Sequence, residues 1–150
     1  MSKLIIVGAS GVGKTTLAKR IITGQFETSH VPTLGVEVHP IPGGFYAWDC
    51  AGDDRYTGLG DGYYAKADCA IVMFDITSPE TKAVVPTYIR DIRRLCGNIP
   101  IAVYANKTDL PCVPEAQLAG VDANKIAVYN TSVKGNDNIT AALNWFNCVM

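Results

Sequence analysis

The fold of this chain is decided by the stretch Gly8-Ala9-Ser10-Gly11-Val12-Gly13-Lys14-Thr15. It matches the phosphate-loop pattern G-x-x-x-x-G-K-[ST]. Residues 3–7, a short apolar run, predict a strand before it, and residues 13–23, which have apolar residues at helical spacing and no proline, predict a helix after it. Glycines let backbone N–H groups approach phosphate oxygens, and the helix N-terminus adds its positive dipole end. The sequence therefore predicts a phosphate-binding loop between a strand and a helix.

The rest of the chain alternates short apolar strands with helical stretches. Further strands are predicted at residues 35–41, 45–49, 69–76, 100–105 and 125–129, and further helices at 84–96 and 138–149. Pro42-Gly43-Gly44 is a hairpin signal between the second and third strands. Ile89, Ile92 and Cys96 are predicted to face the core from helix 84–96, as Ile139, Leu143 and Phe146 are from the last helix. The pattern predicts an α/β fold of the three-layer P-loop NTPase kind, with a mostly parallel six-stranded sheet and helices on both faces.

Composition indicates one globular domain, residues 1–150. Apolar residues make up 48% of the chain, charged residues 18%, and the net charge is -1, which gives no electrostatic footprint for nucleic acid or a membrane surface. Arg90, Arg93 and Arg94 are predicted to form a solvated helix face together with Asp91.

The cysteines and histidines do not predict a metal site. Five scattered cysteines without a C-x-x-C pair favour a reducing compartment, and Cys69 is expected to be a buried small hydrophobe. His30 and His39 lack ligand spacing.

No run reaches membrane-spanning length, and residues 4–7 are too short for a signal peptide's apolar region. Near the end, Cys148 stands third from last, whereas a prenylation box needs the fourth position. We expect a soluble monomer.

A magnesium ligand is expected at the end of strand 45–49. Asp49-Cys50-Ala51-Gly52 follows that strand, where Asp49 would hold Mg²⁺ and the Gly52 N–H would sense a γ-phosphate. In the phosphate loop, Lys14 would reach the β- and γ-phosphates and the Thr15 hydroxyl would ligate Mg²⁺.

The base is specified by Asn106-Lys107-Thr108-Asp109, which ends another strand. The Asp109 carboxylate would accept the guanine N1–H and N2–H together, which adenine cannot supply. Asn106 would pair with the other edge of the base, and the Lys107 stem would cover its plane. After the last predicted strand, Thr131-Ser132-Val133-Lys134 would offer backbone N–H groups to the guanine carbonyl oxygen. A wrong base would leave a buried charge unpaired.

These four motifs, in this order, resemble those of the Ras-like small GTPases. Within that superfamily the chain is most similar to the Ran group, a resemblance carried by the stretches Thr33-Leu34-Gly35-Val36-Glu37-Val38-His39-Pro40, Gly58-Leu59-Gly60-Asp61-Gly62-Tyr63-Tyr64, Thr23-Gly24-Gln25-Phe26-Glu27 and Asn98-Ile99-Pro100-Ile101. The resemblance is close from Lys3 to about Asp109 and looser afterwards.

The resemblance implies a small G-protein fold that holds GTP or GDP with Mg²⁺. The nucleotide-binding residues that it implies are Ser10, Gly11, Val12, Gly13, Lys14, Thr15, Thr16, Phe26, Thr33, Gly52, Asn106, Lys107, Asp109, Ser132, Val133 and Lys134. Thr15, Thr33 and Asp49 would hold the metal, and Lys14, Thr33 and Asp53 would be the residues of the catalytic centre. Residues 26–33, from Phe26 to Thr33, and residues 52–64, from Gly52 to Tyr64, would be the two switches that contact protein effectors.

Two departures from the family bear on hydrolysis. Asp53 stands where the family has the glutamine that positions the attacking water, and His30 stands where Ran-like proteins have a tyrosine. An ionised carboxylate is shorter, donates no hydrogen bond and adds negative charge, so slow hydrolysis is expected. Ser10 also replaces the glycine usual in Ran.

Other departures bear on partners. The hairpin at Pro42-Gly43-Gly44 is shorter than in Ran, and residues 115–120 are not basic. The sequence ends within the last predicted helix, without Ran's further helix and acidic tail. The expected role is a GTP/GDP switch acting on nucleocytoplasmic transport factors or an exchange factor, in cytoplasm and nucleus.

Two alternatives stay open. One is a non-hydrolysing Ran mimic, or decoy, that sequesters transport or exchange factors through the same pocket. The other is a small ATP-dependent kinase, which would need an arginine-bearing lid and would leave Asn106 to Asp109 without a purpose.

Overall fold

Six strands form one sheet in the computed structural model, which describes residues 2–8, 17, 36–41, 43–50, 64–106, 126–130 and 141–149. The strands are β1 (Ser2–Gly8), β2 (Val36–Ile41), β3 (Phe45–Cys50), β4 (Cys69–Asp75), β5 (Ile101–Asn106) and β6 (Ile126–Asn130). Their order across the sheet is β2-β3-β1-β4-β5-β6. Only the edge pair β2–β3 is antiparallel, because a tight hairpin joins these two strands, and the other neighbours are parallel. The predicted mostly parallel six-stranded sheet is confirmed.

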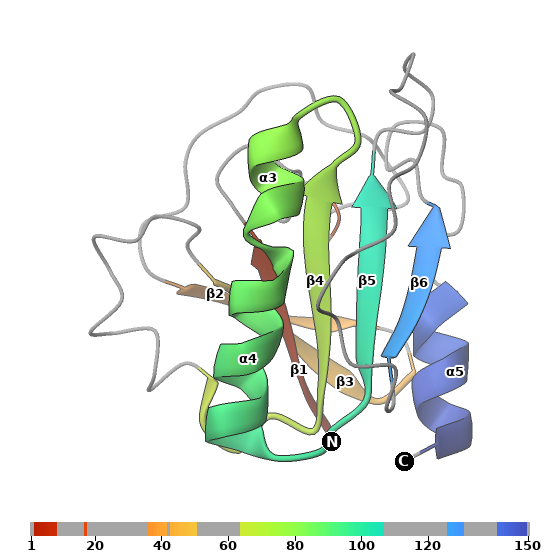
Figure 1. Ribbon diagram of the computed structural model, residues 1–150. Helices are drawn as coiled ribbons and strands as arrows, with labels where there is room; N and C mark the ends of the chain where they lie inside the picture. Colours follow the sequence, from red (N-terminus) through yellow and green to blue (C-terminus); the bar gives the residue numbers. More distant parts are fainter. Residues whose placement is uncertain are drawn as a thin grey trace.

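The helices lie on both faces of the sheet, as the sequence pattern predicted. Figure 1 shows α3 (Pro79–Ala83) and α4 (Val85–Cys96) in front of β1 and β4, and α5 (Ala141–Val149) beside β6. Because side chains alternate along a strand, the sheet has two apolar faces and two buried clusters. Val85, Ile89 and Ile92 of α4 pack in one cluster with alternate residues of β1, β4 and β5. Helix α5 packs in the other cluster.

The α5 cluster identifies the residues of that helix that face the sheet. Leu143 and Phe146 were predicted to do so and are buried, together with Ala142. Leu17, the one described residue of the helix predicted at 13–23, is helical and buried in the same cluster. Ile139 lies outside the described residues.

The predicted boundaries agree with the observed strands to within one residue at each end. The exception among the described elements is helix α3, which sequence analysis missed. Its start carried a signal: Ser78 precedes Pro79 in the first turn, and Glu80 follows. Because α3 ends at Ala83, Val84 stands exposed between two helices, and α4 begins one residue later than predicted.

The hairpin between β2 and β3 turns at two glycines with positive φ, 98° at Gly43 and 85° at Gly44. Residues with a Cβ rarely adopt this conformation, which explains why glycine stands at both positions. The predicted hairpin is confirmed by the antiparallel pairing of β2 and β3. The carbonyl of Gly44 also accepts a hydrogen bond from the Ser2 N–H at 2.9 Å, which fixes the turn to the start of β1.

Helix α4 differs from its prediction at two residues. Cys96 is only partly buried, and its thiol donates to the Tyr64 carbonyl at 2.9 Å, so it is not a full member of the predicted core stripe. Arg93 is not simply solvated, since its Nη1 donates to the carbonyls of Ile99 at 2.5 Å and Gly97 at 3.3 Å. It ties the helix end to the segment before β5. Cys69, by contrast, is fully buried as predicted.

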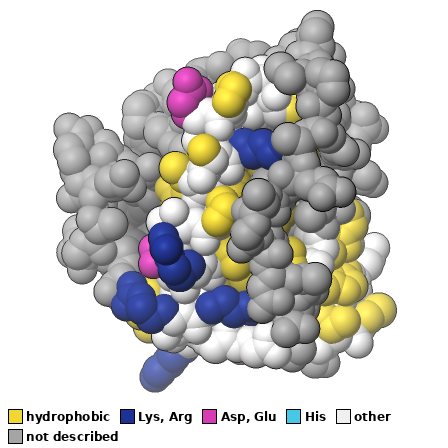
Figure 2. All heavy atoms as spheres, viewed as in Figure 1, with side chains coloured by type: hydrophobic (Ala, Val, Ile, Leu, Met, Phe, Trp, Pro, Cys, Tyr) yellow, Lys and Arg dark blue, Asp and Glu magenta, His cyan; other side chains and the backbone are white. Residues whose placement is uncertain are grey.

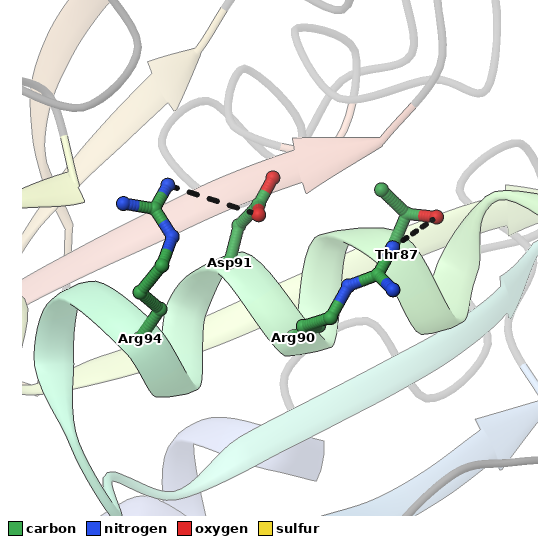
Figure 3. Close-up of polar contacts among 4 residues, drawn as sticks. All are labelled: Thr87, Arg90, Asp91 and Arg94. Atoms are coloured by element: carbon green, nitrogen blue, oxygen red, sulfur yellow. Dashed lines mark hydrogen bonds and ion pairs between the residues drawn. The ribbon is translucent and has the colours of Figure 1, made fainter.

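The outer surface of α4 carries the solvated charges that the sequence predicted. Figure 2 shows Lys and Arg side chains gathered over this helix. In Figure 3, Arg94 turns toward Asp91, 3.8 Å away, and Arg90 turns toward the Thr87 hydroxyl, 3.4 Å away. These long, exposed contacts add little to stability. Among the described residues, no helix is long and apolar enough to cross a membrane.

Candidate functional site

Three polar side chains are buried in the part of the chain that the structure describes, and all three lie at one edge of the sheet. Asp49 is 0% exposed, Asn106 2% and Asp75 8%. Asp75 and Asn106 are the last residues of β4 and β5, and Asp49 is the next-to-last residue of β3. The carboxyl ends of these parallel strands meet at the same edge, where the arrowheads of β4, β5 and β6 point in Figure 1. Since burying polar groups in a core is costly, their concentration here indicates a site.

Asp49 is brought next to the start of the predicted phosphate loop by strand pairing. It stands opposite Ile6 of β1, and β1 ends two residues later at Gly8. Gly8, the first position of the phosphate-loop pattern, has a φ of 151°, a conformation that favours glycine. The described residues thus place a buried carboxylate on the strand beside the one that opens into this loop.

The chemistry of Asp49 fits a magnesium ion. Carboxylate oxygens are ligands that Mg²⁺ prefers, and one or two carboxylates usually suffice beside phosphate oxygens. Asp49 has interactions of its own, and among the described residues its buried Oδ1 accepts no hydrogen bond. Within those residues, no group of three His, Cys, Asp or Glu could hold a metal.

Asn106 is held at the end of β5 by the turn that follows β4. It stands opposite Asp75, and its carbonyl accepts a hydrogen bond from the Ile76 N–H at 3.1 Å. This backbone bond fixes the first residue of the predicted base-recognition motif relative to β4.

Asp75 shapes that turn, and sequence analysis missed it. Its Oδ1 accepts hydrogen bonds from the Thr77 N–H at 2.8 Å and the Thr77 hydroxyl at 2.6 Å. The Asp75 N–H donates to the Thr81 hydroxyl at 2.9 Å. An Asp at the end of a buried strand, two residues before a Thr, is an Asx-turn signal that was present in the sequence.

The structure brings two predicted site residues, Asp49 and Asn106, to the same edge. The other predicted site residues lie outside the described residues: Ser10, Gly11, Val12, Gly13, Lys14, Thr15, Thr16, Phe26, Thr33, Gly52, Asp53, Lys107, Asp109, Ser132, Val133 and Lys134. So does His30, and the side chain of His39 is not described.

The predicted second switch ends at Tyr64, which the structure describes. The Tyr64 carbonyl accepts hydrogen bonds from the Ala67 N–H at 3.2 Å and from the Cys96 thiol. Lys3 of β1 donates through its Nζ to the Ala65 carbonyl at 2.8 Å. The same ammonium lies 3.8 Å from the centre of the Trp48 ring. The chain that follows residue 63 is therefore joined to β1 and α4.

The comparison with protein families agrees with this arrangement. The model of the family described as "Ras family" matches residues 3–148, nearly the whole of the chain. With a buried aspartate and asparagine at the carboxyl edge of a mostly parallel sheet, and a glycine that opens a phosphate-loop motif, the chain belongs to the Ras family of small GTP-binding switch proteins, which bind guanine nucleotide with Mg²⁺ and act as GTPases.

Proposed function

We propose that this protein is a Ran-like GTP/GDP switch that hydrolyses GTP slowly. The observation that carries the proposal is the buried carboxylate of Asp49 on the strand beside the one that opens into the phosphate-loop motif. Four residues further along the chain stands Asp53, at the position that the resemblance assigns to the water-positioning glutamine. Hydrolysis would therefore depend on Asp53, a departure from the family, whereas the predicted binding residues do not include it.

Each predicted residue has a distinct part in nucleotide binding. The phosphates would be held by Lys14 and the backbone of residues 10–16, and guanine by Asn106, Lys107, Asp109 and residues 132–134, with Phe26 and Gly52 completing the contacts. Thr15, Thr33 and Asp49 would hold Mg²⁺. When bound, that ion would supply positive charge that offsets the negative charge of the phosphates.

Slow hydrolysis follows from the chemistry of Asp53. A glutamine can donate to the γ-phosphate and accept from the attacking water at the same time. The Asp53 carboxylate can only accept when ionised, and its charge would repel the phosphate oxygens.

The proposed partners are transport receptors or an exchange factor of the Ran type, bound through residues 26–33 and 52–64 in cytoplasm and nucleus. The second of these segments ends at Tyr64, where the described contacts with Lys3 and Cys96 begin. We therefore expect any change of conformation that depends on the nucleotide to lie N-terminal to these contacts.

Single-turnover hydrolysis tests the effect of Asp53. Purified chain loaded with GTP should retain it for hours, and Asp53→Gln should raise the hydrolysis rate about tenfold or more if the rest of the centre is intact. The matched control is Asp91→Gln, the same change on the outer surface of α4, which should leave the rate unchanged. An unmodified chain that already hydrolyses GTP as fast as Asp53→Gln would contradict the proposal.

The switch and the decoy differ in their preference for the nucleotide state. A switch should bind a purified Ran-type transport receptor more tightly with GTP than with GDP, by about tenfold or more. Equal binding in both states would support the decoy instead. Retention of ATP rather than GTP during purification would contradict both and support the kinase.

A further inference from the structure

The turn that follows β4 closes a ring of atoms around Ile76. The Asp75 Oδ1 accepts hydrogen bonds from the Thr77 N–H at 2.8 Å and from the Thr77 hydroxyl at 2.6 Å. Ile76 stands between these two residues, so the side chain before it is bonded to the backbone after it, as in an Asx turn. The Asp75 carboxylate therefore sets the direction in which the Ile76 N–H points.

The Ile76 N–H is directed at the end of β5. It donates to the carbonyl of Asn106 at 3.1 Å. Asn106 is the last residue of β5, is 2% exposed, and forms with Asp75 the last pair in the described register of β4 and β5. The bond from Ile76 thus extends the hold of β4 on β5 one residue past that pair, at the point where the chain leaves the sheet.

A second side chain supports the same turn. The Thr81 hydroxyl accepts a hydrogen bond from the Asp75 N–H at 2.9 Å and donates to the Ser78 carbonyl at 2.9 Å. The Ser78 N–H donates in turn to the Asp75 carbonyl at 2.9 Å. In Figure 1 the chain leaves the arrowhead of β4, turns above the sheet and enters α3. Because the backbone on both sides of Asp75 is held, its carboxylate has a fixed position from which to constrain Ile76.

We propose that Asp75 is a positioning residue for guanine binding, which acts through the Ile76 N–H on Asn106. The inference rests on the proposed nucleotide-binding function, in which Asn106 pairs with the edge of the base away from its N1–H and N2–H, and it deepens that function. This edge of guanine carries the acceptor N7, to which a side-chain amide can donate. A hydrogen bond weakens when its donor is turned away, so a released Asn106 would bind N7 less well.

The test compares GDP with 7-deaza-GDP, in which a C–H group replaces N7. The unmodified chain should bind GDP about fivefold more tightly than the analogue, the usual effect of one hydrogen bond. In Asp75→Ala the two affinities should come within about twofold of each other, because GDP loses the N7 contact and 7-deaza-GDP has none to lose. An Asp75→Ala variant that keeps the full ratio would overturn the inference.

Asp75→Asn separates the hydrogen bonds of the carboxylate from its charge. The amide oxygen can still accept from Thr77, and asparagine forms the same kind of turn, so the ratio of the two affinities should be retained. If Asp75→Asn behaves like Asp75→Ala, the charge and not the turn is responsible, and the inference is wrong.

Phe146→Leu is the control for general stability. Phe146 is buried in the cluster between the sheet and α5, away from the turn, so this variant should be less stable in urea but keep the ratio of affinities. A ratio that falls equally in Phe146→Leu and Asp75→Ala would show that it follows stability alone, which the inference does not allow.

A second measurement uses the unmodified chain. Because coupling between two sites is reciprocal, saturating GDP should slow amide hydrogen exchange at Ile76 more than saturating 7-deaza-GDP does. The Asp68 N–H, which donates to the Lys3 carbonyl at 2.8 Å just before β4 begins, should exchange alike with both nucleotides.

The outcomes distinguish this inference from the proposed function. Equal exchange at Ile76 with the two nucleotides, or equal affinity of the unmodified chain for them, would overturn the role of Asp75 while leaving GDP binding intact. A chain that binds no guanine nucleotide at all would overturn the proposed function and the inference together.

Discussion

At the scale of single residues, the buried charge of Asp49 is the most expensive group of the described site. Taking a carboxylate out of water costs several kcal/mol even after the protein relaxes, so its place must be favoured by something that interacts with the charge. In the site proposed above, that interaction would be with the magnesium ion of the bound nucleotide. Asp49 would then be a residue kept for binding at some expense to the stability of the nucleotide-free protein.

Replacing Asp49 by Asn tests whether this carboxylate contributes to binding at the expense of stability. The isosteric amide removes the charge, so Mg²⁺ should no longer slow GDP release, and the release rate should match that of the unmodified chain in EDTA. Stability of the nucleotide-free variant should be unchanged or higher. Dissociation of a fluorescent GDP analogue with and without EDTA, followed by urea unfolding, measures both effects.

The matched control for that experiment is Asp91→Asn, which removes a carboxylate from the outer surface of α4. Its response to Mg²⁺ should be that of the unmodified chain. Magnesium that still slows GDP release from Asp49→Asn would exclude Asp49 as a metal ligand.

At the scale of elements, the turn from β4 into α3 depends on side chains more than on backbone pairing. Asp75 accepts two hydrogen bonds from Thr77, and the next residue, Ile76, donates to the carbonyl of Asn106. Loss of the carboxylate would release the turn and, through it, the end of β5.

Asp75→Ala should therefore lower the free energy of unfolding by about 1 kcal/mol, since it removes the acceptor of two hydrogen bonds from Thr77. Denaturant titration measures the change. Ser78→Ala is the control in the same turn, because the Ser78 hydroxyl donates to the exposed carboxylate of Glu80 at 3.0 Å, and its effect should stay within about 0.5 kcal/mol. Equal effects of the two substitutions would mean that Asp75 does not hold the turn.

The strands were predictable and some of the contacts between elements were not. Runs such as Cys69 to Asp75 are apolar at every position, and that local pattern is enough to identify a strand buried on both faces. Asp49 and Asn106 were predictable because their motifs follow strands. The hydroxyl contact of Tyr104 with Ala142 and the contacts of Arg93 with the segment before β5 depend on tertiary structure, which no local pattern encodes. Helix α3 was missed although its start was marked, because it has only five residues and buries none of them.

At the scale of the whole molecule, the core contains groups that resist ionisation. Burial raises the pKa of the Cys69 thiol above its ordinary value of 9.0, with a further rise from Asp68, and it raises that of Tyr104 above 10.0. A group whose pKa is higher in the folded than in the unfolded state stabilises the fold below its ordinary pKa. That stabilisation is lost as the pH rises above the ordinary value, because only the unfolded chain then releases the proton.

The free energy of unfolding should therefore decline above about pH 9, by about 1.4 kcal/mol per pH unit for each such group. Urea titrations at pH 8, 9 and 10 measure the slope. In Cys69→Ala the slope of the free energy of unfolding against pH should be smaller by the contribution of one group. Cys148→Ala, which alters an exposed cysteine, should keep the original slope. A slope that Cys69→Ala does not change would contradict the burial of this thiol.

The position of Lys3 over Trp48 also gives the protein a spectroscopic use. Trp48 is next to Asp49 in the sequence. The Lys3 ammonium that lies over its ring also donates a hydrogen bond to the Ala65 carbonyl. The only other tryptophan, Trp145, packs 5.5 Å from Phe146 on the opposite face of the sheet. In a Trp145→Phe variant, Trp48 would be the remaining tryptophan, and the wavelength and intensity of its emission would depend on the nearby Lys3 ammonium. Conversion between the two nucleotide states could then be followed in real time by intrinsic fluorescence, without an attached dye.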